Sequence, residues 1–192
     1  PQKYQEEINV LKQSFTHYGW ACALVGDFYG NKQDYTSAFT FYMKGAELQD
    51  GSSAYKLSTL YNDGLGVTQS KQSCLVWLNK AAEYNSKDAL LYLGYSHYLA
   101  NPDYNIEHDI HKAVSYFERA ATQGAHYAAL LLGNIYMFGA DDIQENDEEA
   151  MKWFRTAADM RNSDACLYIG YMYDQGKGVT KDLNEAMRWY KK

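Results

Sequence analysis

The sequence predicts an all-α fold, a right-handed α/α solenoid superhelix of about five helix-turn-helix repeats. Three observations lead to this class. Small, apolar and aromatic residues return in the same order five times along the 192 residues. Within each unit their spacing follows the 3.6-residue period of a helix, and strand signals are few. Only two prolines occur in the chain, which leaves room for uninterrupted helices.

The composition indicates a folded chain with a substantial core. Its residues are 46% hydrophobic and 16% aromatic, and 19 of them are tyrosine. With 18 basic against 24 acidic residues the formal charge is −6, and no basic stripe stands out, so we expect no nucleic-acid partner. No apolar run approaches the length of a membrane span, and the opening stretch PQKYQEEINV has the character of neither a signal peptide nor a transit peptide.

The first helix of each unit is marked by one small residue. An alanine or serine stands five positions before it and a tyrosine or histidine three positions after it, so one helical face is repeated. These marker residues recur every 32–39 positions. They are Gly26, Ser58, Gly94, Gly133 and Gly170.

The second helix of each unit carries an alanine or cysteine, followed three positions later by an aromatic residue. Four positions before each of these alanines or cysteines stands a residue type favoured as a helix N-cap. The predicted N-caps are Asp34, Ser70, Asp109, Asn146 and Asp182. In the last unit Glu185 also stands at capping-box spacing from Asp182.

The turn between the two helices reads YNDGLGV (61–67) in the second unit and YDQGKGV (173–179) in the fifth. Glycines around a lysine invite an interpretation as a phosphate-binding loop. Such a loop needs a strand before it, and the second unit has leucine where the fifth has lysine. We therefore expect turns that end one helix and enter the next, where a left-handed backbone suits glycine.

Three cysteines, Cys22, Cys74 and Cys166, stand far apart and form no pair of the metal-binding kind. We expect them to be free thiols in the core, where cysteine behaves as a small apolar residue. Unpaired cysteines favour a reducing compartment such as the cytoplasm.

The residues described so far resemble a known family. The pattern A-x-x-x-L-G-x-x-Y-x-x-G-x-G-V…D-x-x-x-A-x-x-W-Y-x-K-A-A is similar to the Sel-one-like repeat, a subclass of the tetratricopeptide-type solenoids, and residues 165–192 match it best. The resemblance covers residues 19–192 and implies one continuous solenoid domain after a degenerate helix at 1–18. The implied repeats are 19–50, 51–86, 87–125, 126–162 and 163–192. The last repeat lacks the final Ala-Ala, so its end is expected to leave an apolar face for self-association or for further chain.

The resemblance also implies a function. It implies a non-enzymatic interaction module, an adaptor, scaffold or immunity-type inhibitor, whose partner is another protein or a peptide segment. Bacterial members of the family include host-interaction factors, envelope and secretion-associated proteins and immunity proteins. Because many bacterial relatives are exported, the compartment stays open.

Stacked helix pairs form a concave face that binds partners. On the helical wheel, positions −6, −2, +1 and +5 from each marker residue share one stripe of the first helices, away from the core. Tyrosine, which is enriched in binding hot spots, is frequent there in the last three units. The predicted partner-binding residues are Trp20, Asp27, Lys56, Asp63, Tyr92, Tyr95, Tyr127, Asn134, Phe138, Tyr168 and Tyr171. The competing interpretation is that these tyrosines pack between neighbouring first helices.

We expect no enzyme, no metal site and no cofactor. His108 and His111 in EHDIH have no identifiable third ligand, so we interpret them as solvated loop residues. The acidic run DDIQENDEE (141–149) lacks the spacing of a calcium loop and instead places acids at a helix N-terminus. No nucleophile–base motif is readable. The alternative function is a receptor or hydrolase acting on glycan or peptidoglycan-like small ligands, on which tyrosines stack as well.

Overall fold

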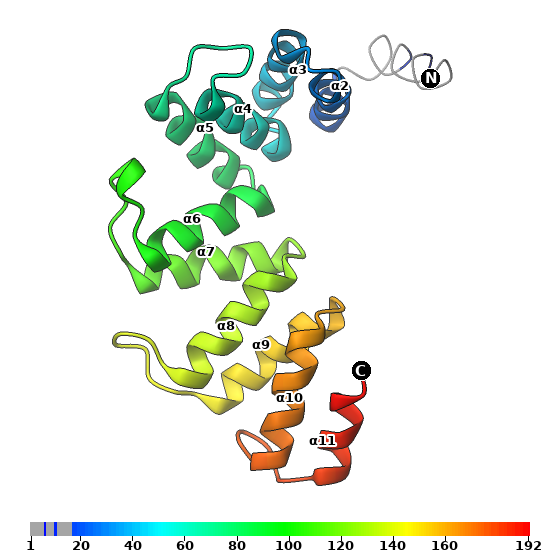
Figure 1. The fold of residues 1–192 in the computed structure, drawn as a ribbon, viewed down its shortest axis with the longest axis vertical. Coiled ribbons are helices and arrows are strands. Elements are labelled where there is room, and N and C mark those ends of the chain that lie inside the picture. The colour runs from blue at the N-terminus through cyan, green and yellow to red at the C-terminus, as the bar shows by residue number, and fades with distance from the viewer. Residues whose placement is uncertain (1–5, 7–9, 11–16) are drawn as a thin grey trace. The chain divides into compact units, whose positions relative to one another are not determined.

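The computed structural model describes residues 6, 10 and 17–192, and the degenerate helix expected at 1–18 lies almost wholly outside them. The described part is all-α, with ten α-helices, one 3-10 turn and no strand (Figure 1). The helices are α2 (Gly19–Asn31), α3 (Tyr35–Glu47), α4 (Gly51–Asp63), α5 (Lys71–Glu83), α6 (Lys87–Leu99), α7 (Ile110–Thr122), α8 (His126–Phe138), α9 (Asp147–Asp159), α10 (Ser163–Gln175) and α11 (Leu183–Tyr190). The 3-10 turn η1 (Pro102–Tyr104) lies between α6 and α7.

The helices group into two compact units. The first unit runs to Leu90 and includes Pro102–Asn105, so it holds α2 to α5, the start of α6 and η1. Within it α2 packs on α3, and α4 packs on both α3 and α5. The second unit holds Leu91–Asn101 and Ile106–Lys192, and there α8 packs on α7 and α9, and α10 on α9 and α11.

The marker residue is glycine in four repeats because an aromatic ring of the second helix lies directly against it. A Cβ added to any of these glycines would come within 2.6 Å of a ring carbon, closer than real side chains pack. The four pairs are Gly26–Tyr42, Gly94–Phe117, Gly133–Phe154 and Gly170–Tyr190. In the second repeat the ring position is Leu78, and the marker there is Ser58. The size of the marker residue therefore follows the side chain that the second helix presents.

All five predicted N-caps are confirmed. Each side chain accepts a hydrogen bond from a backbone N–H three residues later, at 2.9–3.1 Å. The backbone N–H of the same five residues donates to the carbonyl of the tyrosine or histidine three positions after the marker, at 2.7–3.0 Å. The N-cap residue thus begins the second helix and also ties it to the end of the first.

The capping-box spacing in the last repeat produces only half of that motif. Asp182 accepts from the backbone N–H of Glu185, but the Glu185 carboxylate pairs with Arg188 at 3.0 Å. The reciprocal hydrogen bond of a capping box would run from the Asp182 N–H to the Glu185 carboxylate. It does not form, because the Asp182 N–H already donates to the carbonyl of Tyr173.

The glycine turns are confirmed as helix ends. Gly64 and Gly176 follow α4 and α10 with φ of 68° and 72°, in the left-handed region. The next residues, Leu65 and Lys177, donate their N–H back to the carbonyls of Leu60 and Met172, as in a Schellman motif. No strand precedes either turn, so the phosphate-loop interpretation is excluded for these residues.

The turns of the third and fourth repeats are longer, and each closes with a short backbone bridge. The bridges join Asn101 to Ile106 and Ala140 to Ile143. In the first unit, η1 reaches back to earlier helices, because the Tyr104 hydroxyl donates to Asn62 Oδ1 at 2.7 Å. The expected thiols in the core are also confirmed, since Cys22, Cys74 and Cys166 are buried and none of them forms a disulfide.

Gly133→Ala should destabilise the protein, although alanine is the better helix former. The added methyl group would meet the Phe154 ring at 2.4 Å. Overpacking of this kind lowers the free energy of unfolding by about 1–3 kcal/mol, whereas the better helix propensity of alanine raises it by ~1 kcal/mol. Urea unfolding followed by circular dichroism measures the change.

A second substitution tests the cause of that loss. Leucine in place of a ring is what the second repeat uses, so Phe154→Leu should make room for the new methyl group. The double variant should then lose less stability than the two single variants lose together. Strictly additive losses would contradict the ring-on-glycine explanation.

Candidate functional site

In the first unit the predicted site residues are polar apart from Trp20, whose ring stacks on Tyr18 with centroids 6.2 Å apart. Trp20 is exposed on α2, and Asp63 is exposed at the end of α4, where it accepts from the Asn62 amide at 2.7 Å. Asp27 accepts from the Tyr42 hydroxyl at 2.7 Å and pairs with Lys56 at 3.3 Å. Because Asp27 and Lys56 neutralise each other, this unit presents little unbalanced charge along the predicted stripe.

In the second unit five of the predicted residues are exposed rings on the first helices. They belong to α6, α8 and α10, and their exposed fractions run from 36% for Tyr92 to 61% for Phe138. We call this set the aromatic stripe, and it consists of Tyr92, Tyr95, Tyr127, Phe138 and Tyr171. Rings of this size left in water are candidates for partner contact rather than for the core.

Tyr95 joins the aromatic stripe to the core beneath it. One edge of its ring meets Phe117 in a T-shaped contact with centroids 5.5 Å apart. Partial burial raises the pKa of the Tyr95 hydroxyl, and the neighbouring hydroxyls of Tyr127 and Tyr98 add to that rise. Tyr95 therefore remains a neutral hydrogen-bond donor across the physiological range, on a ring whose position is fixed by Phe117.

Tyr168 and Asn134 behave differently from the stripe. The Tyr168 ring is half-buried and stacks on Phe154 of the preceding repeat, with centroids 4.7 Å apart and planes 4° from parallel. Tyr168 therefore packs between repeats, although on the second helix α9 and not between first helices as the competing interpretation expects. Asn134 is also half-buried, and its Oδ1 atom is buried without a hydrogen bond from the described residues.

An open hollow of about 620 Å³ lies at the end of α8 beside the stripe. Phe138 and Ile143 line it together with the carboxylates of Asp141 and Glu145. The hollow thus combines an apolar surface with two acidic groups.

The predicted set of partner-binding residues omits one exposed residue that belongs with the stripe. Leu99 stands five positions after Gly94, in the register of Phe138, and is 70% exposed at the end of α6. The same periodic count that placed Phe138 on the stripe predicts Leu99 there too.

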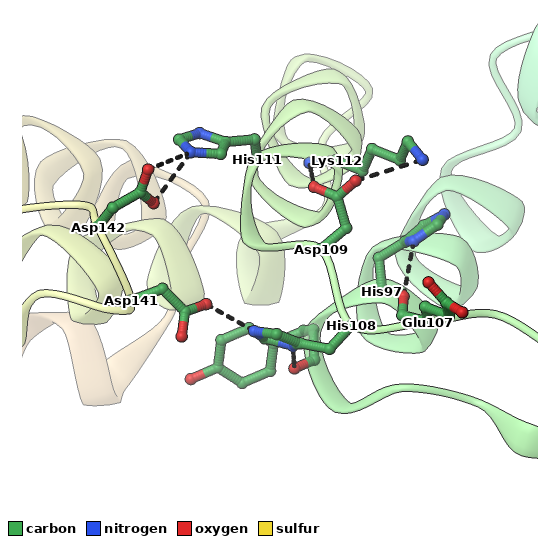
Figure 2. Close-up of polar contacts among 9 residues, drawn as sticks. His97, Glu107, His108, Asp109, His111, Lys112, Asp141 and Asp142 are labelled. Carbon is green, nitrogen blue, oxygen red and sulfur yellow. Dashed lines mark hydrogen bonds and ion pairs between the residues drawn. The ribbon is translucent and has the colours of Figure 1, made fainter.

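The histidines of EHDIH are exposed, as expected, but each has a carboxylate partner in the next long turn (Figure 2). His108 lies 2.6 Å from Asp141 and His111 lies 3.0 Å from Asp142. The interpretation as merely solvated loop residues is therefore incomplete. Within the described residues no group of three or more His, Cys, Asp or Glu side chains could hold a metal ion.

Comparison with known proteins decides the family. The Sel1 repeat model matches residues 21–50, 51–84, 87–124, 126–162 and 163–192, which is nearly the whole chain. The chain belongs to the Sel1 repeat family. A solved structure agrees: a Sel1 repeat protein from Oxalobacter formigenes superposes with a TM-score of 0.79 at 26% identity, covering 98% of this chain and 78% of that one. The predicted α/α solenoid is thereby confirmed.

Two curated relatives of this Sel1 repeat chain come from yeasts. The chitin synthase regulator SKT5 of Saccharomyces cerevisiae is 29% identical over 72% of this chain and 20% of its own length. The ERAD-associated E3 ubiquitin-protein ligase component HRD3 of Candida glabrata is 38% identical over 41% of this chain and 9% of its own. The chain thus spans about a fifth or less of each relative. Because the family includes yeast and bacterial proteins, a bacterial origin does not follow from family membership.

None of the helices in the described ranges combines the length and the apolar character that a bilayer crossing requires.

Two tyrosine substitutions should distinguish a ring that stabilises the fold from a ring that is only exposed on the surface. Tyr168→Ala removes the stack on Phe154 and should lower the free energy of unfolding by about 1–3 kcal/mol. Tyr127→Ala, at a position 54% exposed, should change it by no more than about 0.5 kcal/mol. Chemical denaturation of both variants measures the difference, and equal losses would show that Tyr127 also supports the fold.

Proposed function

We propose that this Sel1 repeat chain is a non-enzymatic protein-binding module that holds a partner against the aromatic stripe of α6, α8 and α10. One observation carries the proposal. Successive first helices of the second unit each expose at least one large ring, and every one of these rings falls on the stripe of positions −6, −2, +1 and +5, where Tyr95 and Tyr171 share position +1. A periodic scaffold therefore displays aromatic groups on one side of its first helices.

Aromatic rings of this kind suit protein recognition for a physical reason. Tyrosine offers a large contact area and a hydroxyl, and it loses little rotamer entropy because only two side-chain torsions become fixed. Tyr95 is held further by its edge contact with Phe117, so part of the entropy cost of binding is met before the partner arrives. The stripe can thus bury rings against a partner while its hydroxyls bond to backbone groups.

The charges beside the stripe support a partner with some basic character. The run between α8 and α9 exposes Glu145, the first turn of α9 exposes Glu148, and the formal charge of the chain is −6. Asp141 and Asp142 of the same run already contact His108 and His111. Lys112, the basic residue at the start of α7, is already paired with Asp109 at 3.2 Å. Charge complementarity of this kind acts mainly on the association rate and on the choice of partner.

The relatives favour a regulator or adaptor over an enzyme. SKT5 is a regulator of chitin synthase, and HRD3 is a component of a ubiquitin ligase complex. Both are relatives over the repeats that this chain contains, so the repeats are the part that the likeness concerns. We extend that role to this chain as an adaptor, scaffold or inhibitor that works by occupying a protein surface.

The double variant Tyr95→Ala with Tyr171→Ala should abolish capture of the partner without unfolding the protein. Both rings are about two-fifths exposed, so helicity should be retained, and the melting temperature should fall only by the loss of the Tyr95–Phe117 edge contact. Affinity capture from a native lysate, followed by mass spectrometry, compares this variant with the wild type. A stoichiometric protein that the wild type retains and the variant loses is the expected result.

The matched control is Val76→Ala with Met187→Ala. Both residues are apolar and exposed, at 44% and 53%, and both lie on second helices, away from the stripe. This control should keep the partner. If the control loses it as well, or if the wild type retains no protein, the stripe is not a protein-binding surface, and glycan fragments become the ligands to test.

A further inference from the structure

Two histidine–aspartate contacts connect the start of α7 and the residues before it to the segment before α9 (Figure 2). His108 Nε2 lies 2.6 Å from Asp141 Oδ2, and His111 Nε2 lies 3.0 Å from Asp142 Oδ1. The members of each pair are more than thirty residues apart in the chain. His108 lies in the long turn before α7, His111 in the first turn of α7, and both aspartates in the long turn before α9. Both contacts lie within the second unit.

The geometry of His108 specifies its protonation state. Its Nδ1 atom lies 2.7 Å from the backbone carbonyl oxygen of Tyr98, at the end of α6. Both ring nitrogens therefore face oxygen atoms that accept hydrogen bonds and have no proton to give when Asp141 is ionised. A neutral imidazole has one donor and one acceptor nitrogen, so it satisfies only one of these contacts. The imidazolium form donates at both and joins α6 to the turn after α8.

The charged groups around the two histidines favour the same form. On their own segment stand Glu107 and Asp109, while Asp141 and Asp142 face them from the turn after α8 (Figure 2). The nearby Lys112 is held by Asp109, and His97 of α6 lies with Nδ1 3.3 Å from the Glu107 carbonyl. Carboxylates thus outnumber the cations near both imidazoles.

The pKa shifts of His108 and His111 agree with their surroundings. The hydrogen bond with Asp141 raises the pKa of His108, and the Tyr98 carbonyl raises it further. The hydrogen bond with Asp142 raises the pKa of His111. The pKa of the acceptor shifts in the opposite direction, because the hydrogen bond with His111 lowers the pKa of Asp142.

We propose that the doubly bonded imidazolium of His108, assisted by His111, is a proton-operated latch that fastens the two long turns beside the aromatic stripe. Its effect on recognition rests on the proposed function above. Asp141 lines the same hollow as Phe138, and the Tyr98 carbonyl lies one residue from the exposed Leu99. The latch therefore fixes two ends of the surface that would meet the partner.

The sign of the pH effect follows from the raised pKa values. A histidine with a raised pKa in the folded state contributes its full stabilisation below its unfolded pKa of about 6.5. That contribution disappears as the pH rises through the higher folded pKa. The latch is closed in mildly acidic solution and opens above neutrality, and partner binding weakens in the same direction.

NMR titration of the full chain, labelled at its histidine rings, tests the latch without any partner. His108 should titrate above about 6.5, and Asp141→Asn should move its pKa down toward that ordinary value. His126, which contacts Asn162 rather than a carboxylate, is the internal control and should not respond to Asp141→Asn. An ordinary pKa for His108, or one that Asp141→Asn leaves unchanged, overturns the proposal.

Hydrogen exchange then tests whether the titration fastens the turns. At about pH 5.5 residues 100–109 and 139–146 should exchange roughly two- to fivefold more slowly in the wild type than in His108→Gln. At about pH 8.5 that difference should vanish, because neither protein then carries a charge at residue 108. His111→Gln should produce a smaller change of the same sign. If the wild type and His108→Gln exchange at equal rates at both pH values, the latch is refuted. A failure of partner capture alone would overturn the proposed binding role of the stripe and not the latch.

Discussion

The contact on which the repeat depends is an aromatic ring of the second helix packed directly against a glycine of the first. It brings the two helix backbones close together, and it explains why four marker positions tolerate no side chain. The repeat with Leu78 in place of a ring accepts Ser58, so the contact is a matched pair rather than a requirement for glycine as such. The N-cap residues hold the same two helices at the other end of the turn, through one side-chain and one backbone hydrogen bond each.

This close pairing determines which residues remain for function. The ring and the small residues face inward, so the opposite side of each first helix is relieved of core packing and can carry residues chosen for recognition. In the second unit that side carries the aromatic stripe, whereas in the first unit Asp27 and Lys56 pair with each other there. The two units therefore share a construction and differ in what they display. Family membership accounts for the construction, and under the proposed function the displayed side chains would select the partner.

Much of the fold could be predicted from the sequence because its signals are local. The five N-caps and the glycine turns depend on residue types within a few positions of each other, and the structure confirms them. The site was harder to predict because it depends on how neighbouring repeats pack. The wheel placed Tyr168 and Tyr171 on one stripe, yet only the packed structure puts Tyr168 on Phe154. Likewise no spacing rule connects His108 with Asp141, which stands 33 residues later in another turn.

The central claim is that the partner lies on the aromatic stripe, and site-specific photo-crosslinking tests it most directly. A benzophenone side chain at position 171 would occupy the stripe, and the same group at position 187, which is 53% exposed on the second helix α11, would lie outside it. The account predicts a covalent adduct between the partner and the protein carrying the probe at 171, and little or none from 187. Equal adducts from both positions, or an adduct from 187 alone, would contradict it.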